Sequence, residues 1–227
     1  MKKVVVFTGA GISAESGLKT FRGQDGLWEG TNIKDVATPA AWKRDRKRVL
    51  DFYNQRRKQC IAANPNAAHL AIKKLEEYFD TYVITQNIDD LHERAGSENI
   101  IHLHGEICKA QSSLNPKFVY TMQVAEINLG DTCELGSQLR PHVVWFGEEV
   151  PNLKKAEELT NQADVFIVVG TSLQVYPAAN LLNQTKAGCE VYLIDPNAEE
   201  MNVGWQIKRY SMSATVGVPK LVDELTK

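Results

Sequence analysis

Short runs of apolar and β-branched residues recur along the chain, and they constrain its fold more than any other feature. These runs are Val4 to Phe7, Tyr82 to Thr85, Ile100 to Leu103, Val165 to Val169, and Val191 to Ile194. They lack regular polar alternation, which is typical of parallel strands buried on both faces by helices. Because stretches with helical signals separate them, the sequence predicts an α/β fold with a doubly wound, mostly parallel, Rossmann-like sheet.

Helix signals agree with this architecture. Asn66 can cap a helix that runs to about Phe79, and Pro177 can open one that ends near Gly188. Two segments do not follow the alternation of strands and helices: 30–64 is rich in Lys and Arg, and 106–139 lacks clear periodicity. We predict that both form a small inserted lobe, and that 1–29, 65–105 and 140–227 form the Rossmann-like domain.

Composition excludes several classes of protein. The chain has 227 residues and a formal net charge of -2, so it has no overall basic field that would attract nucleic acid. Its apolar runs are too short for a signal peptide or a membrane span. The four cysteines form no CxxC pair, which favours reduced thiols. We therefore expect a cytoplasmic protein without nucleic-acid or membrane partners.

A glycine-rich segment follows the first predicted strand. Gly9 to Ala14 reads GAGISA, the G-x-G-x-x-A form of the dinucleotide fingerprint. Glycines permit a sharp turn and a close approach to a pyrophosphate, and the helix that follows offers N-H groups to its charge. The motif alone fits a simple tight turn equally well. The acidic residue expected roughly twenty positions later is missing, which disfavours an ordinary dehydrogenase.

Five blocks, in order, resemble the sirtuin family and together span nearly the whole chain. They are Gly9 to Trp28 (GAGISAESGLKTFRGQDGLW), Thr85 to His92 (TQNIDDLH), His102 to Gly105 (HLHG), Leu139 to Glu148 (LRPHVVWFGE), and Gly170 to Leu173 (GTSL). The resemblance implies an NAD-dependent protein-lysine deacylase that acts on acylated proteins. NAD would be consumed, with release of nicotinamide and O-acyl-ADP-ribose.

The resemblance also implies a set of NAD-binding residues. The phosphates and the nicotinamide ribose would be lined by Gly9, Ala10, Gly11, Ser13, Phe21 and Arg22, with Glu15 and Trp28 in the same block. The nicotinamide end would be enclosed by Gln86, Asn87, Ile88 and Asp89. The adenosine side would be held by Gly170, Thr171, Ser172, Asn197 and Ala214.

The same resemblance implies that His104 is the catalytic residue, acting together with Asn87 and Asp89. In sirtuin-like chemistry the acyl oxygen attacks the ribose C1′, and a base then removes a proton from a ribose hydroxyl. A histidine suits this role because its unperturbed pKa is about 6.5. Asp89 could equally cap the short helix that Gly96 closes. The remaining histidines are interpreted as structural: His69, His92, His102 and His142.

Two features concern the substrate. By resemblance, Val144, Trp145, Phe146 and Gly147 pair with the substrate peptide as an added strand, although this segment could be only a strand end and turn. Tyr53 and Arg56 lie three apart in a predicted helix, and a phenol beside a guanidinium can bind a carboxylate. The pair resembles the Y-x-x-R motif of sirtuins that accept succinyl, malonyl or glutaryl lysine. Alternatively, Arg56 and Arg57 belong to a solvated basic face.

The chain departs from the family at the structural zinc site of the small lobe. The four usual cysteine positions fall on Ser112, Asn115, Cys133 and Leu135, so one thiolate remains of the four that a closed site needs. We predict no zinc. The lobe would instead be held by apolar packing of Leu114, Phe118, Val119, Tyr120, Ile127 and Leu129.

Two other activities compete with deacylation. The same activated ribose could be captured by a protein nucleophile, as in a mono-ADP-ribosyltransferase. The chain could also be a silent NAD-binding module. Intact Asn87, Asp89 and His104 favour deacylation.

Overall fold

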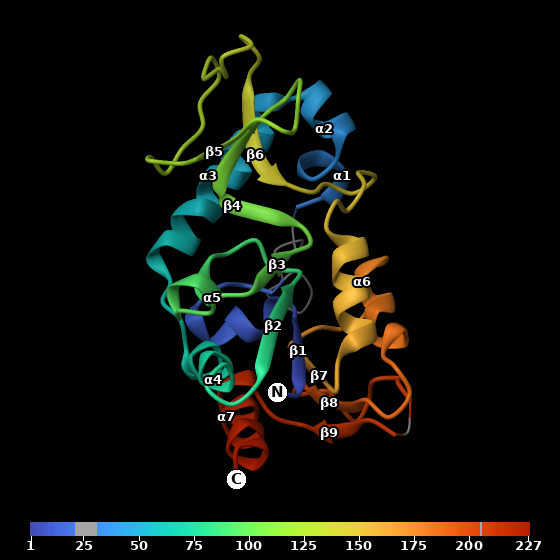
Figure 1. Cartoon of the computed structure of the whole chain (residues 1–227). Coiled ribbons are helices and arrows are strands. Elements are labelled where there is room, and N and C mark those ends of the chain that lie inside the picture. Colours follow the sequence, from blue (N-terminus) through green and yellow to red (C-terminus); the bar gives the residue numbers. More distant parts are fainter. Residues whose placement is uncertain (21–30, 205) are drawn as a thin grey trace.

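The computed structural model describes residues 1–20, 31–204 and 206–227. Its main sheet has six strands in the order β3 (Ile100–His102), β2 (Asp80–Thr85), β1 (Lys3–Thr8), β7 (Val165–Val169), β8 (Glu190–Ile194) and β9 (Lys208–Tyr210) (Figure 1). Every pair of neighbours is parallel. The predicted α/β fold is therefore confirmed. The strand order reverses between β1 and β7, and ligands bind at such a reversal in doubly wound sheets.

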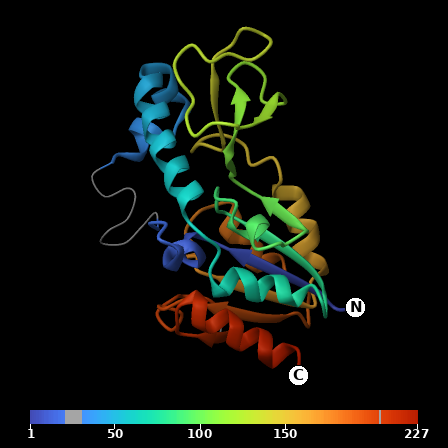
Figure 2. The same cartoon turned by 90° about the vertical axis from the view of Figure 1, so that its left-hand side faces the viewer.

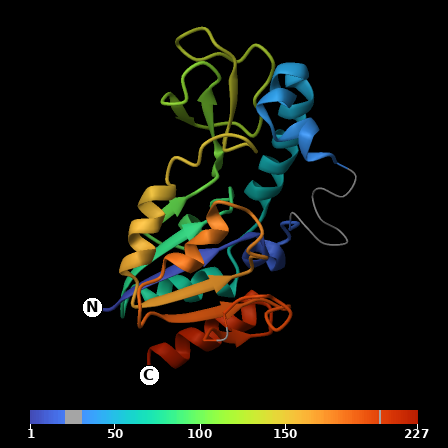
Figure 3. The ribbon, with the colours of Figure 1, turned by 90° about the vertical axis from the view of Figure 1, so that its right-hand side faces the viewer.

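Helices cover both faces of this sheet (Figures 2 and 3). Val4 and Val6 of β1 point to the face covered by η1 (Ala10–Ser16), α4 (Ala67–Leu75) and α7 (Ala214–Leu225). Val5 and Phe7 point to the opposite face, where α6 (Leu153–Gln162) and η2 (Ala178–Gln184) pack. Because both faces of β1 are buried, its residues 4–7 are apolar without a gap.

A second, three-stranded antiparallel sheet lies beyond the carboxyl ends of β1 and β2 (Figure 1). Its order is β5 (Val119–Thr121), β4 (Gly105–Ser112) and β6 (Leu139–Val143). Three helices accompany it: α1 (Ile33–Val36), α2 (Pro39–Arg44) and α3 (Arg46–Ala62). A shared core contains Trp42, Leu50, Ile107 and Trp145. Strands β4 and β6 cross the limits of the segment 106–139, and the proposed domain boundaries remain a prediction.

Local signals were confirmed at several elements. Asn66 caps α4, accepting from the Ala68 amide at 3.0 Å, although the regular helix ends at Leu75. The helix predicted after Pro177 is a 3-10 helix that ends at Gln184. Short α5 (Leu91–Arg94) precedes Gly96, whose φ of 96° suits glycine. Among the described helices, none combines the length and apolar character needed to cross a bilayer.

The apolar packing predicted for the small lobe is partly wrong. Ile127 is 1% exposed, as a core residue should be. Leu114, Val119 and Leu129 are instead 70%, 39% and 55% exposed. Polar contacts within the loops position this region, because Gln138 donates from Nε2 to the carbonyl oxygens of Asn128 and Asp131 at 2.8 and 3.0 Å.

Candidate active site

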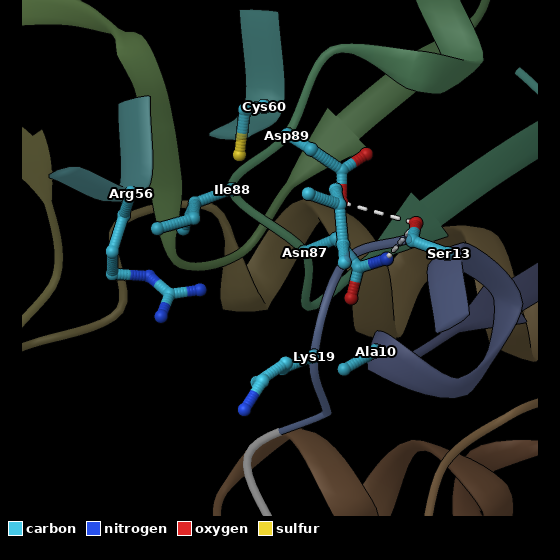
Figure 4. A pocket seen from close by; sticks show the side chains of 9 residues that line it. Ala10, Ser13, Lys19, Arg56, Cys60, Asn87, Ile88 and Asp89 are labelled. Atoms are coloured by element: carbon cyan, nitrogen blue, oxygen red, sulfur yellow. Dashed lines mark hydrogen bonds between the residues drawn. The ribbon is translucent and has the colours of Figure 1, made fainter. Parts of the chain in front are cut away.

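A cleft of about 1130 Å³ opens between the carboxyl ends of the parallel strands and the antiparallel sheet. It is lined by most residues that the motifs predicted: Gly9, Ala10, Gly11, Glu15, Tyr53, Arg56, Gln86, Asn87, Ile88, His104, Val144, Trp145, Phe146, Gly147, Gly170, Thr171, Ser172, Asn197 and Ala214. Ser13 and Asp89 line a small adjoining pocket (Figure 4). The predicted Phe21, Arg22 and Trp28 lie outside the described residues.

The glycines bring the loops after β1 and β7 into contact. The Gly9 amide donates to the Val169 carbonyl at 3.0 Å, and the Gly11 amide donates to the Gly170 carbonyl at 2.8 Å. A Cβ on Gly11 would lie 2.6 Å from the Gly170 Cα, closer than any side chain tolerates. These two amides are therefore engaged within the protein, and the glycines act here by permitting close approach.

The loop after β2 is held by polar side chains from three elements. Gln86 Nε2 donates to the Thr171 hydroxyl at 2.9 Å, and Asn87 Nδ2 donates to Ser13 Oγ at 3.1 Å. Ser13 Oγ in turn donates to Asp89 Oδ2 at 3.1 Å (Figure 4). Asn87 Oδ1 is buried and has no hydrogen-bond partner within residues 1–20, 31–204 and 206–227. Such an atom points to a donor supplied by a ligand or water.

Asp89 lies one residue before the N-cap of α5, which is Asp90, so the suggestion that Asp89 itself is the N-cap is wrong. Asp89 Oδ1 accepts from the Leu91 amide at 3.2 Å, at the start of α5. Burial raises the pKa of Asp89, although the hydrogen bonds from Leu91 and Ser13 oppose that effect. The residue is therefore part of the fold as well as of the predicted site.

His104 is oriented by the same loop. Its Nδ1 lies 2.9 Å from the Gln86 carbonyl oxygen, which can only accept, so Nδ1 carries the proton of the neutral ring. This leaves the Nε2 lone pair available as a base in a residue that lines the cleft. Burial lowers the pKa of His104, while the bond to the Gln86 carbonyl works in the opposite direction. The imidazole is thus neutral near pH 7, as a general base requires.

Helix α3 brings Tyr53 and Arg56 to the opposite side of the cleft. Their exposures are 5% and 7%, and Arg57 is fully buried. The alternative that both arginines belong to a solvated face is therefore wrong. The Arg56 guanidinium lies 5.6 Å from the centre of the Phe52 ring, and that ring meets Tyr53 edge-on at 5.0 Å. Burial lowers the pKa of Arg56, which means that the site disfavours its charge.

The segment after β6 is tied into the protein by its amides. The Val144 amide donates to the His104 carbonyl at 2.9 Å, and the Phe146 amide donates to the Ala37 carbonyl at 3.0 Å. The Trp145 amide donates to Glu148 Oε2 at 2.8 Å. An added peptide strand could therefore not accept from these three amides. Pairing there would have to use other backbone groups.

The expected zinc positions contain a hydrogen-bonded cluster. Ser112 Oγ lies 2.8 Å from Ser137 Oγ, and Cys133 Sγ lies 3.4 Å from Ser112 Oγ and 3.2 Å from Ser137 Oγ. Hydrogen bonds with Ser112 and Ser137 lower the pKa of Cys133 to about 7. Ser112 Oγ also accepts from the Asn115 amide at 3.1 Å. These contacts link three of the four expected zinc positions, Ser112, Asn115 and Cys133, and the absence of zinc stays a prediction.

Several lining residues lie outside the five sequence blocks. They include Ile33, Ala37, Phe52, Val150, Gln174 to Pro177, Ile194 to Pro196, Glu200 to Val203, and Ser213. Asp195 directly follows the predicted strand Val191 to Ile194, so its place at a carboxyl strand end was a usable signal. Glu15 also has a structural role, because it accepts from the Ser213 hydroxyl at 3.2 Å and from the Thr215 amide at 3.1 Å.

A glycine-lined cleft at the reversal of a doubly wound sheet, with a neutral histidine at its wall, defines an α/β dinucleotide-binding enzyme. The sequence profile of the Sir2 family matches residues 9–177, and the chain belongs to that family. The chain is an NAD-dependent protein deacylase of the sirtuin type.

Similar proteins support this assignment along the whole chain. The NAD-dependent protein deacylase of Helicobacter pylori (strain ATCC 700392 / 26695) is 49% identical over 225 residues, covering 99% of this chain and 98% of that protein. The NAD-dependent protein deacylase of Aggregatibacter actinomycetemcomitans is 52% identical over 193 residues, covering 85% and 92%.

Solved structures give the same result. A Sir2 homologue in complex with NAD superimposes with a TM-score of 0.90 at 39% identity, covering 99% of this chain and 90% of that one. A Sir2 protein with a deacetylated p53 peptide and 3′-O-acetyl ADP ribose gives 0.79 at 31% identity, covering 97% and 92%.

Proposed function

We propose that this deacylase prefers lysines that carry acidic acyl groups, such as succinyl or malonyl, and that His104 is its general base. The observation that carries the acyl preference is the pairing of buried Tyr53 and Arg56 in the wall of the cleft. The proposed products are nicotinamide, O-acyl-ADP-ribose and the free lysine of the protein substrate.

The residues of the cleft fit NAD. The volume of the cleft, about 1130 Å³, exceeds that of most small-ligand sites. The buried Asn87 Oδ1 can accept a hydrogen bond from a ligand amide such as that of nicotinamide. Gly170, Thr171 and Asn197 line the cleft at the ends of β7 and β8, where the adenosine half would lie. When bound, NAD supplies a ribose carbon from which nicotinamide can depart.

The proposed proton transfer starts at His104. The Gln86 carbonyl holds Nδ1-H, so Nε2 can take a proton from a ribose hydroxyl once the acyl oxygen is bound to the sugar. Asn87 and Asp89 share Ser13 Oγ, which fixes the loop that would enclose the nicotinamide. These residues can orient the reacting groups with little further loss of conformational entropy, because their side chains are already held by hydrogen bonds.

The proposed acyl pocket follows from the charge of Arg56. Its guanidinium is desolvated by burial, and a carboxylate at the end of the acyl chain would stabilise the positive charge at short range. Arg can bind a carboxylate through two parallel hydrogen bonds, and the Tyr53 hydroxyl can donate a third. An acetyl group brings no charge and would gain nothing from either residue.

One assay tests the activity and separates it from the alternatives. The protein is incubated with NAD that is labelled in its ADP-ribose part and with either a succinylated or an acetylated peptide. Nicotinamide release, peptide mass and transfer of the label to protein are followed. Nicotinamide release coupled to free lysine, faster on the succinylated peptide, is expected. Label on protein would indicate ADP-ribosyl transfer instead. Full turnover by His104→Ala, with NAD still bound, would refute the role of His104.

A further inference from the structure

His102, the last residue of β3, faces two hydrogen-bond acceptors. Its Nδ1 lies 3.1 Å from the Asn87 carbonyl oxygen, and its Nε2 lies 2.6 Å from Glu93 Oε1. A carbonyl oxygen and an ionised carboxylate have no proton to give. Both ring nitrogens must then donate, which requires the charged, doubly protonated imidazolium.

The surroundings support a charge at this place, although the His102 side chain is only 8% exposed. The ionisable groups near it are Asp89, His92 and Glu93 around α5, Glu106 and Lys109 on β4, and His142 on β6. Burial by itself lowers the pKa of His102, but the hydrogen bond and charge of Glu93, with Glu106, outweigh it and raise the pKa. Interaction with His102 keeps the pKa of Glu93 low against the effect of burial, so Glu93 stays ionised.

This cation holds the loop on which the proposed chemistry depends. His104 Nδ1 binds the Gln86 carbonyl at 2.9 Å, and His102 Nδ1 binds the next carbonyl, that of Asn87, at 3.1 Å. The backbone N-H of Asn87 donates to Thr85 Oγ1 at 3.0 Å, so this residue is held at its N-H as well as at its carbonyl. The two histidines of the HLHG block therefore hold consecutive peptide groups of one loop.

We propose that protonated His102 is a positioning residue that sets the Asn87 carbonyl, and through it the loop beside His104, for catalysis. This rests on the proposed function of His104. The two acceptors require the charged ring, and because the pKa of His102 is raised, this charge persists to higher pH than on an ordinary imidazole and is lost as the pH rises through that pKa. Turnover should therefore fall at alkaline pH when His102 loses its proton, whereas protonation of His104 limits it at acid pH.

The decisive measurement is the pH profile of kcat for Glu93→Gln. The glutamine side chain can still accept from Nε2 but removes the charge, so the alkaline limb should move down by about one to two pH units. Glu98→Gln is the matched control, because the Glu98 side chain is 77% exposed and pairs with Lys73 instead. The control should keep the wild-type profile. The KM for NAD should stay unchanged in both variants.

A second readout does not depend on folding of that variant or on turnover. In wild-type protein labelled with ¹⁵N-histidine, the His102 ring should show the imidazolium shifts at pH 7, with His102→Gln assigning the signal. The inference would be refuted by a neutral His102 ring at pH 7, or by an alkaline limb that has the same position in Glu93→Gln as in the wild type. Neither result would affect deacylation by the wild type. Full turnover by His104→Ala would instead refute the proposed role of His104, on which this inference rests.

Discussion

Replacing Arg56 by methionine should separate the two acyl substrates. Met keeps an unbranched side chain of similar reach but removes the guanidinium, in a residue that is 7% exposed. Truncating one partner of a buried, hydrogen-bonded charge pair costs about 2–5 kcal/mol, and each 1.4 kcal/mol is about tenfold. Taking roughly 3 kcal/mol, kcat/KM for a succinylated peptide should fall by about 150-fold. For an acetylated peptide it should change by less than about threefold, because no charge pair is lost.

The neighbouring arginine provides the matched control. Arg57 undergoes the same chemical change in Arg57→Met, but its Nε donates to the Ile107 carbonyl at 2.7 Å and its Nη1 to Asn54 Oδ1 at 2.8 Å. That variant should unfold at lower temperature while keeping the succinyl-to-acetyl ratio of kcat/KM. Both ratios are obtained by mass spectrometry of peptides that share one flanking sequence. Equal losses on both peptides in Arg56→Met would refute the proposed acyl pocket.

Four further outcomes are expected. The acid limb of kcat/KM should have its midpoint below about 6.5, because burial lowers the pKa of His104 and its neutral form is the base; a midpoint above that value would contradict the assignment. Burial lowers the pKa of His69 to about 4 and also lowers the pKa of His92. As the pH falls, these histidines therefore take up protons in the unfolded chain before they do so in the folded one, and the free energy of unfolding should decrease below about pH 6.5. Urea titrations at pH 7 and 5 should show this loss, and His69→Gln should reduce it by roughly 1–2 kcal/mol. Gly11→Ala should cost about 1–3 kcal/mol, because the new Cβ would lie 2.6 Å from the Gly170 Cα, and should weaken NAD binding in calorimetric titration. Metal analysis of the purified protein should find far less than the roughly one zinc per chain that a closed structural site holds, and a full equivalent would overturn that prediction.

The parallel strands were predictable because burial on both faces is encoded locally. The run Val165 to Val169 corresponds residue for residue to β7. Edge strand β9 (Lys208–Tyr210) was missed, because its residues are exposed or half-buried and show no apolar run. Strand β4 was missed for a different reason. Its pairing with β6 shifts register between Gly105 and Ala110, which breaks the alternation that a sequence pattern needs.

Most of the candidate site was predictable where its residues lie in continuous blocks, and Tyr53, Arg56, Asn197 and Ala214 were named outside them. The loop Gln86 to Asp89 and His104 could be named because the blocks TQNIDDLH and HLHG resemble those of the sirtuin family. What the blocks could not show is how they touch. The bond between Gln86 and Thr171 joins residues 85 positions apart, and the contact of Gly11 with Gly170 joins the loops that follow the neighbouring strands β1 and β7. Such contacts depend on strand order, which local sequence does not encode.

Helix α3 shows why adjacent residues of one type can have different roles. Tyr53 and Arg56 lie three apart and line the cleft. Asn54 and Arg57 are also three apart: Arg57 donates to the Ile107 carbonyl of β4, and Asn54 exchanges two hydrogen bonds at 2.9 and 3.0 Å with Ile127, in the loop between β5 and β6. Successive residues of a helix differ by about 100° in direction, so a shift of one residue would exchange the two arginines. The register of α3 therefore decides which arginine can meet a substrate. Polar contacts of Asn54 and Arg57 on the neighbouring face stabilise that register, which links the packing of the small sheet and its loops against α3 to the proposed acyl preference.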